Sequence, residues 1–312
     1  MSVRPNILVI GGSYFVGRVF VEKLLALNRY NIYALNRGTV PMRLEGVKQL
    51  RCDRSDGEAL RKVVPDVPWQ AVVDFCAYTP QDIETTMQAL CDHQLAQYIY
   101  ISTATVYEPS SRQPIDESGA TLCASQPHLG PAADYGFQKR LAELAVIAQC
   151  DRRGIPYTLV RPTFIFGKYN YAPRESYFFE QILKCNTVVI PDREPPARFS
   201  FVSVWDVAFI VADCIGNPAA YGEVFNASGD EELSYPALVD CFKEVTGIDF
   251  TVKKLSIAEI ETQRIPLPFP LDEDLLYSGR HSRQVLNYCY IPFKKAMQET
   301  YRLYRLGLGL DG

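Results

Sequence analysis

Short apolar runs alternate with amphipathic stretches through the first half of the chain. Runs of four to six residues rich in Val and Ile indicate buried strands, and the stretches between them carry apolar residues at helical spacing. The strands expected are Asn6–Ile10, Asn31–Leu35, Val47–Arg51, Ala71–Asp74, Gln97–Ser102 and Tyr157–Arg161. The helices expected are Phe15–Leu27, Gly57–Val64, Pro80–His93 and Asp134–Arg153. This alternation predicts the α/β class, as a doubly wound parallel sheet with strand order 3-2-1-4-5-6.

The pattern changes after Arg161-Pro162. Prolines and aromatic residues become frequent, as in Tyr169–Pro173 and Ile265–Pro270, and the elements become shorter and less regular. The helices expected there are Trp205–Ile215, Tyr235–Thr246 and Phe293–Tyr304, and the strands are Glu223–Ala227 and Phe250–Leu255. We therefore expect residues 1–165 to form the sheet domain, with residues 199–228 returning to it. Residues 166–312 are expected to form mainly a smaller, C-terminal substrate-binding lobe.

A glycine turn, Gly11–Gly17, joins the first expected strand directly to the first helix. This order brings backbone N–H groups and the positive end of a helix to one point, which suits the pyrophosphate of a dinucleotide. Tyr14 stands where a GxxGxxG pattern has its middle glycine, so the phosphates must lie higher or border the tyrosine backbone. The turn predicts a dinucleotide-binding domain of the Rossmann type, with the cofactor contacted by Gly11, Ser13, Tyr14, Phe15 and Val16.

The end of the second strand, Asn36-Arg37, bears on the choice of cofactor. An acidic residue there would bind the ribose hydroxyls of NAD, whereas a guanidinium without a carboxylate favours the extra phosphate of NADP. NAD remains the alternative, because Arg37 could instead stack on adenine or face water. Topology adds residues at the adenine edge, at the nicotinamide side and after the sixth strand, namely Asp53, Arg54, Cys76, Ala77 and Pro162.

The long helix near residue 134 opens with Tyr135-Gly136-Phe137-Gln138-Lys139, which sets Tyr135 and Lys139 one turn apart on the same face. An isolated tyrosine hydroxyl titrates near ~10, and a nearby ammonium, together with an oxidised nicotinamide, favours the phenolate. Tyr135 is therefore expected to accept a proton near neutral pH. The fifth strand runs out into the hydroxyl residues Ser102, Thr103 and Thr105, which can hold a substrate oxygen.

Together these signals resemble the extended short-chain dehydrogenase/reductase superfamily, in its NAD-dependent epimerase/dehydratase family, over nearly the whole chain. The resemblance is carried by the glycine turn, Asp53, Ser102–Tyr107, Tyr135–Lys139, Arg161-Pro162-Thr163 with Gly167, and Phe201–Ala208. The variant turn and the following Asn36-Arg37-Gly38 resemble an atypical branch that also contains the chloroplast stem-loop RNA-binding proteins.

The resemblance implies catalytic roles for three residues. Thr103 hydrogen-bonds the reacting oxygen, Tyr135 exchanges its proton, and Lys139 holds the nicotinamide ribose and tunes Tyr135. Dehydratases of the superfamily place an Asp-Glu pair after the threonine, whereas this chain has Ala104-Thr105, so epimerisation or carbonyl reduction is expected. The substrate contacts expected are Thr105, Arg198 for a diphosphate, and Arg280, with Arg283 as an alternative.

The expected function is an NAD(P)-dependent epimerase or reductase that acts on a nucleotide-sugar by hydride transfer at a ring carbon. Two alternatives stay open: an NADPH-dependent reductase of a small carbonyl compound, and a non-catalytic dinucleotide-binding or RNA-binding protein. The net charge of −4 and the pI near 5.6 argue against a nucleic-acid partner. The resemblance implies a homodimer.

Composition bounds the remaining classes. The 312 residues are 47% hydrophobic, which is ample for a large core. No apolar run approaches the ~20 residues that cross a bilayer, so no membrane partner and a cytoplasmic location are expected. The nine cysteines form no CxxC pair and lie near no histidine at ligand spacing, so we expect no metal site.

Overall fold

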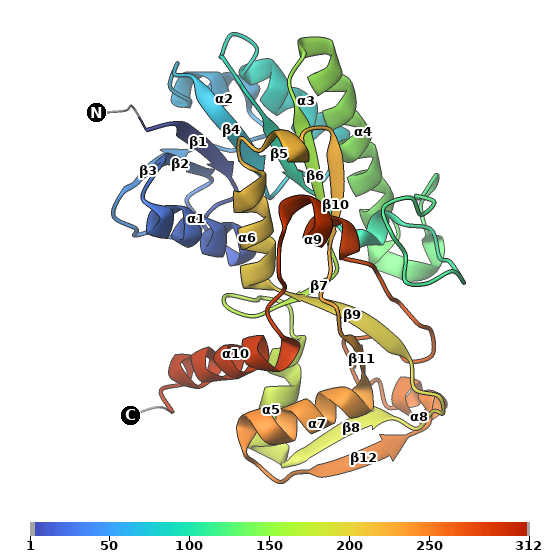
Figure 1. Cartoon of the computed structure of the whole chain (residues 1–312). Helices are drawn as coiled ribbons and strands as arrows, with labels where there is room; N and C mark the ends of the chain where they lie inside the picture. Colours follow the sequence, from blue (N-terminus) through green and yellow to red (C-terminus); the bar gives the residue numbers. More distant parts are fainter. Residues whose placement is uncertain (1–3, 311–312) are drawn as a thin grey trace.

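The computed structural model describes residues 4–310 and shows an upper and a lower lobe (Figure 1). A parallel sheet with strand order β10-β6-β5-β4-β1-β2-β3 forms the centre of the upper lobe. Its strands are β1 (Asn6–Ile10), β2 (Asn31–Asn36), β3 (Val47–Arg51), β4 (Trp69–Asp74), β5 (Tyr98–Ile101), β6 (Tyr157–Pro162) and β10 (Glu223–Ala227). The predicted α/β class and the order of the first six strands are confirmed, and β10 adds a seventh strand beside β6.

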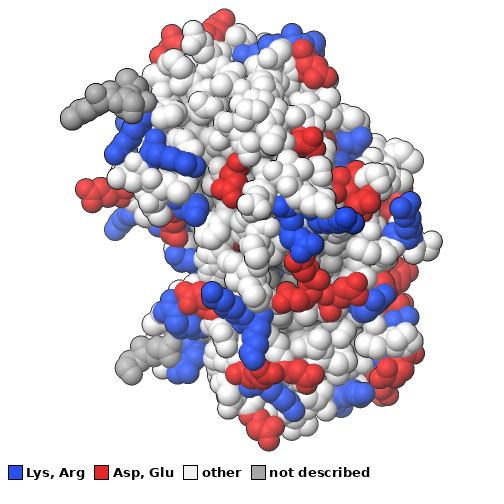
Figure 2. Space-filling model, viewed as in Figure 1, with Lys and Arg blue, Asp and Glu red and all other residues white. Residues whose placement is uncertain are grey.

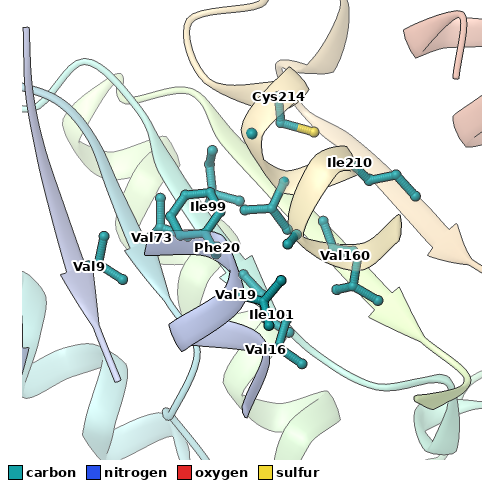
Figure 3. Packing of buried hydrophobic residues seen from close by; sticks show 14 of the residues in the cluster. Val9, Val16, Val19, Phe20, Val73, Ile99, Ile101, Val160, Ile210 and Cys214 are labelled. Carbon is teal, nitrogen blue, oxygen red and sulfur yellow. The ribbon is translucent and has the colours of Figure 1, made fainter. Parts of the chain in front are cut away.

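Helices cover both faces of this sheet. One face carries α1 (Phe15–Leu27) and α6 (Val204–Cys214), and the other carries α2 (Gly57–Val63), α3 (Pro80–Ala89) and α4 (Tyr135–Arg153). Alternate residues of β1 serve the two cores: Ile7 and Val9 lie under α1 and α6, whereas Leu8 and Ile10 lie on the opposite side. Figure 3 shows the core between the sheet and helices α1 and α6. Burial on both faces explains why the strands are continuous apolar runs.

Local sequence signals set several helix boundaries. Thr79 and Asp82 form a reciprocal capping box at the start of α3, and Pro80 occupies the first helical position, where its missing N–H costs nothing. Asn28 and Gly154 take left-handed conformations at the ends of α1 and α4. The structure ends α3 at Ala89, four residues before the predicted boundary.

The lower lobe is built mainly from the second half of the chain. Its elements, with those that join it to the sheet, are β7 (Phe164–Phe166), α5 (Glu175–Cys185), β8 (Thr187–Pro191), β9 (Arg198–Ser203), β11 (Glu232–Ser234), α7 (Tyr235–Thr246), β12 (Thr251–Leu255), α8 (Ile257–Thr262), α9 (Arg280–Leu286) and α10 (Phe293–Gly307). The predicted elements α7, β12 and α10 are confirmed with small boundary shifts. Aromatic rings form the core of this lobe; Phe269, for example, packs against Phe178 and Phe199.

The chain crosses between the lobes several times. β7 leaves the sheet lobe and pairs in parallel with β9, from which α6 returns to the sheet. α9 also packs against β10 and α6, so residues after 228 contribute to the upper lobe as well. Within residues 4–310, no helix combines the length and the apolar character that a bilayer crossing requires.

Candidate active site

The turn from β1 into α1 depends on close backbone packing. Gly11 has a φ of +85°, and its N–H donates to the carbonyl oxygen of Leu35 at 3.0 Å. A Cβ atom on Gly17 would collide with the carbonyl oxygen of Gly11, so only glycine allows the helix to start this near the turn. Phe15 has a φ of +42°, which is strained for an aromatic residue. No side chain caps the start of α1.

Tyr14 replaces the expected middle glycine without its ring entering the turn. The ring is stacked on Tyr171 with centroids 5.3 Å apart, and Phe15 meets the same tyrosine edge-on at 5.6 Å. Tyr171 lies in the segment between β7 and α5. The stacking of Tyr14 on Tyr171 therefore links the glycine turn to the segment between β7 and α5.

Two adjoining cavities lie along the carboxyl ends of the strands. The first, the reaction cavity, is lined by expected residues that include Gly11, Tyr14, Phe15, Val16, Cys76, Thr103, Tyr135, Lys139 and Pro162. The second, the adenosine cavity, is lined by Ser13, Asn36, Arg37, Asp53 and Arg54, and it shares Gly11, Tyr14, Cys76 and Tyr78 with the first. An extended cleft that passes a glycine turn fits a dinucleotide.

Thr103 and Tyr135 meet because two elements approach each other closely. Thr103 follows β5 and caps a 3₁₀ turn (Ala104–Val106), and its Oγ1 donates to Thr105 Oγ1 at 3.0 Å. A Cβ on Gly136 would collide with the carbonyl oxygen of Thr105, so glycine lets the start of α4 reach this turn. Gly136 was not among the expected site residues, although it stands inside the Tyr-Lys motif.

Burial and three neighbouring side chains shift the pKa of Tyr135. Burial raises its pKa, a hydrogen bond with Thr103 and the charge of Arg174 lower it, and the net pKa stays above the ordinary value. Thr103 and Arg174 thus partly offset the effect of burial on the phenol of Tyr135.

Lys139 is 3% exposed and points at backbone carbonyl groups. Its Nζ donates to the carbonyl oxygens of Ala77 at 2.9 Å and Ile101 at 2.7 Å, which follow or end β4 and β5. Burial lowers the pKa of Lys139 to about 8, although Asp74 and Glu143 oppose the shift. Ala77 is fully buried and, unlike Cys76, is not part of either cavity wall.

Arg54 was expected at the adenine edge of the cofactor site. Its guanidinium forms hydrogen bonds with groups of the protein itself. It donates to Asp74 Oδ1 at 2.7 Å, to Thr86 Oγ1 at 2.7 Å and to the carbonyl oxygen of Asp82 at 2.8 Å. Asp74 is completely buried and also accepts a hydrogen bond from the Tyr98 hydroxyl at 2.8 Å. Arg54 also lines the adenosine cavity, where its guanidinium is ion-paired with Asp74.

The expected substrate residues do not line the reaction cavity. Arg198 is exposed and forms ion pairs with Asp274 and Glu232, each at 2.6 Å. Arg280 lines a separate cavity together with Arg283 and Asp230. Thr105 is exposed and supports Thr103 instead. A residue that the motifs missed, Arg174, does line the reaction cavity, on an irregular segment that no periodic pattern marks.

Comparisons with known proteins agree with this geometry. The sequence model of the NAD dependent epimerase/dehydratase family matches residues 7–227. The chain is 25% identical to the chloroplast stem-loop binding protein of 41 kDa b of Arabidopsis thaliana over 260 residues, which is 79% of this chain and 64% of that protein. It is 29% identical to 2'-dehydrokanamycin reductase of Streptomyces kanamyceticus over 144 residues, 46% of this chain and 38% of that enzyme. The matches thus span less than two thirds of both relatives.

Solved structures show the same fold. A UDP-glucose 4-epimerase with UDP-glucose from Thermotoga maritima superposes with a TM-score of 0.79 at 18% identity, covering 97% of this chain and 99% of that chain. The family match covers well over half of the sequence and includes the glycine turn, Thr103 and the Tyr-Lys motif. The chain belongs to the NAD dependent epimerase/dehydratase family.

Proposed function

We propose that this protein is an NAD(P)-dependent epimerase that acts on a nucleotide-activated sugar at a ring carbon. One observation carries the proposal: Thr103 and Tyr135 line the same cavity, which also contains the glycine turn and adjoins the adenosine cavity. A phenol placed to exchange a proton therefore lies next to a site with the shape and backbone donors for a dinucleotide.

Tyr135, Thr103 and Lys139 have different roles in the proposed reaction. A nicotinamide held in the cleft would accept a hydride from the sugar carbon and return it. Tyr135 takes the proton of the sugar hydroxyl and gives it back, and Thr103 positions that oxygen while favouring the phenolate. Lys139 keeps the ends of β4 and β5 together beneath the site and is expected to hold the nicotinamide ribose.

Epimerisation is proposed ahead of dehydration because of the side chains near Thr103. Removal of water needs an acid and a base beside the sugar, and the chain has Ala104-Thr105 after Thr103. None of the described residues that line the reaction cavity is an aspartate or a glutamate. A keto intermediate that turns over and receives the hydride on its other face needs no such pair.

The test is an incubation of the protein with UDP-glucose, UDP-N-acetylglucosamine and dTDP-glucose at catalytic amounts of NAD or NADP, followed by proton NMR of the sugar. We expect one substrate to reach an epimer equilibrium with no net change in cofactor absorbance at 340 nm. Consumption of NADPH in proportion to product, without an epimer, would reject epimerisation.

A reductase of a small carbonyl compound is the second candidate, favoured by Asn36 and Arg37 at the wall of the adenosine cavity. Arg37 has no carboxylate beside it on its own strand end, and the nearest acidic residue of the cavity wall is Asp53 after β3. A guanidinium in this position suits the 2'-phosphate of NADP, and reductases release their cofactor after each turnover. The relative named as a 2'-dehydrokanamycin reductase is consistent with this reading. Oxidation of one NADPH for each product molecule would distinguish such a reductase from an epimerase.

A third candidate, RNA binding, is raised by the chloroplast stem-loop binding relative. Basic and acidic side chains are intermingled on the face seen in Figure 2, which gives that face no continuous basic surface. RNA affinity that falls steeply with salt, together with no turnover of the sugar-nucleotide panel, would favour this candidate.

A further inference from the structure

The reaction cavity has an unbalanced charge. Two cationic side chains, Lys139 and Arg174, line it, and the described residues of its wall include no carboxylate. A cavity lined by one sign of charge attracts ligands of the opposite sign. The position and the partners of each cation decide which of them faces a ligand.

Lys139 is largely committed to the protein. Its ammonium is bonded to the Ala77 and Ile101 carbonyl oxygens and lies 4.3 Å from the centroid of the Tyr100 ring. An ammonium has three donors, so these contacts leave at most one for a ligand.

Arg174 has more of its donors free. It stands at the start of α5, where Nη1 donates to the carbonyl oxygen of Ile165 at 2.7 Å, and its guanidinium carbon lies 5.7 Å from the centroid of the Phe164 ring. This is the one hydrogen bond that the described residues give its five N–H donors. The backbone contact and the ring fix the guanidinium while its other edge remains available.

The neighbouring carboxylate is used elsewhere. Glu175 is 3% exposed, accepts the Gly167 N–H at 2.9 Å and accepts both hydrogen bonds of the Asn170 amide. It therefore stabilises the segment between β7 and α5 and forms no ion pair with Arg174. Arg174 and Tyr135 both line the reaction cavity, so a ligand in it can contact both side chains.

We propose that Arg174 binds a carboxylate or phosphate group of the substrate beside Tyr135. This inference rests on the proposed function, because it names the group by which a sugar nucleotide would be held there. The planar fork of a guanidinium matches either anion through two parallel hydrogen bonds. The anion has two sources: the diphosphate of the nucleotide, or a carboxylate on the sugar ring.

The test is isothermal titration of protein saturated with reduced cofactor, using UDP-glucuronate and UDP-glucose. The variants are Arg174→Gln, Arg174→Lys, which keeps the charge but loses the fork, and Arg152→Gln, a matched control on the exposed end of α4. We expect Arg174→Gln to weaken binding about 10- to 100-fold, the scale of a charge-assisted pair, and Arg174→Lys to weaken it less. Circular dichroism melts establish that each variant is folded.

The pattern across ligands identifies the source of the anion. A loss confined to UDP-glucuronate assigns a sugar carboxylate, and an equal loss for both ligands assigns the diphosphate. Unchanged affinities in folded Arg174→Gln would overturn the inference. If the wild type binds neither sugar nucleotide, the proposed substrate class fails. D-glucuronate and inorganic pyrophosphate are then titrated into wild type and Arg174→Gln. Binding of either anion that is lost in Arg174→Gln supports an anion site at Arg174. Binding that survives the substitution, or no binding to wild type, rejects that site.

Discussion

The buried ion pair beneath the nucleotide cleft gives the sharpest stability prediction, through the substitution Asp74→Asn. Asp74 is completely buried, and Oδ1 accepts hydrogen bonds from Arg54 Nη1 at 2.7 Å and from the backbone N–H groups of Cys76 and Ala77 at 3.0 Å. Asparagine can keep the two backbone bonds through its oxygen. The substitution removes the negative charge that balances the guanidinium of Arg54.

The magnitude follows from the partners that remain. Removing one member of a buried pair costs about 3–5 kcal/mol, because the other charge is left without compensation. Asp82 still lies 3.7 Å from Arg54 Nε, so we expect the lower end, about 3 kcal/mol of unfolding free energy. The double variant Arg54→Met/Asp74→Asn is expected to recover part of this loss, since the orphaned cation is gone.

The assay is equilibrium unfolding in urea at several pH values. Burial raises the pKa of Asp74, but the charge of Arg54 and the hydrogen bonds from Arg54 and Tyr98 together lower it by more. The pKa of Asp74 in the folded protein therefore lies below its ordinary value. Such a carboxylate contributes its full stability above the unfolded pKa of about 3.9 and loses it as the pH falls toward the folded pKa. The gap between wild type and Asp74→Asn should therefore narrow below about pH 4. A gap under about 1 kcal/mol at pH 7 would refute the structural role given to Arg54.

Three further predictions concern the cleft. Gly17→Ala should weaken nicotinamide dinucleotide binding at least about tenfold in a titration, because its Cβ would collide with the Gly11 carbonyl oxygen; unchanged affinity would contradict the described turn. Arg37→Ala should reduce NADP affinity about tenfold or more and leave NAD affinity nearly unchanged, and equal losses would remove the 2'-phosphate role. The pKa of Lys139 is lowered to about 8, so the unfolded chain binds more protons between about pH 8 and 10.5. The unfolding free energy of wild type relative to Lys139→Met should therefore rise over this range, and a flat difference would contradict the burial of the ammonium.

The sheet and the proximity of Thr103 and Tyr135 could be predicted from sequence for a simple physical reason. Parallel strands buried on both faces must be continuous apolar runs, and their carboxyl ends share one edge of the sheet. Residues that follow β1, β4 and β5 and the start of α4 are therefore neighbours in any such fold. Thr103 and Tyr135 both line the reaction cavity for this reason.

The partners of charged side chains could not be predicted in the same way. Arg54 and Arg198 find their carboxylates at Asp74 and Asp274, contacts that depend on how loops fold back rather than on a local period. Arg174 follows a proline in a segment without helical or strand periodicity. Short strands such as β7 and β11, three residues each, carry too few positions for a pattern to be recognised. β9 alternates Phe199 and Phe201 with polar residues, a signal that sequence reasoning could have used.

The most direct test of the account compares Tyr135→Phe with the matched control Tyr157→Phe, whose residue starts β6 at the opposite edge of the sheet. Sugar-nucleotide turnover and dinucleotide affinity are measured for both variants. We predict that Tyr135→Phe lowers kcat at least about 100-fold, with the dinucleotide dissociation constant within about twofold of wild type, and that Tyr157→Phe changes neither. Full turnover by folded Tyr135→Phe would contradict the claim that this phenol exchanges the substrate proton.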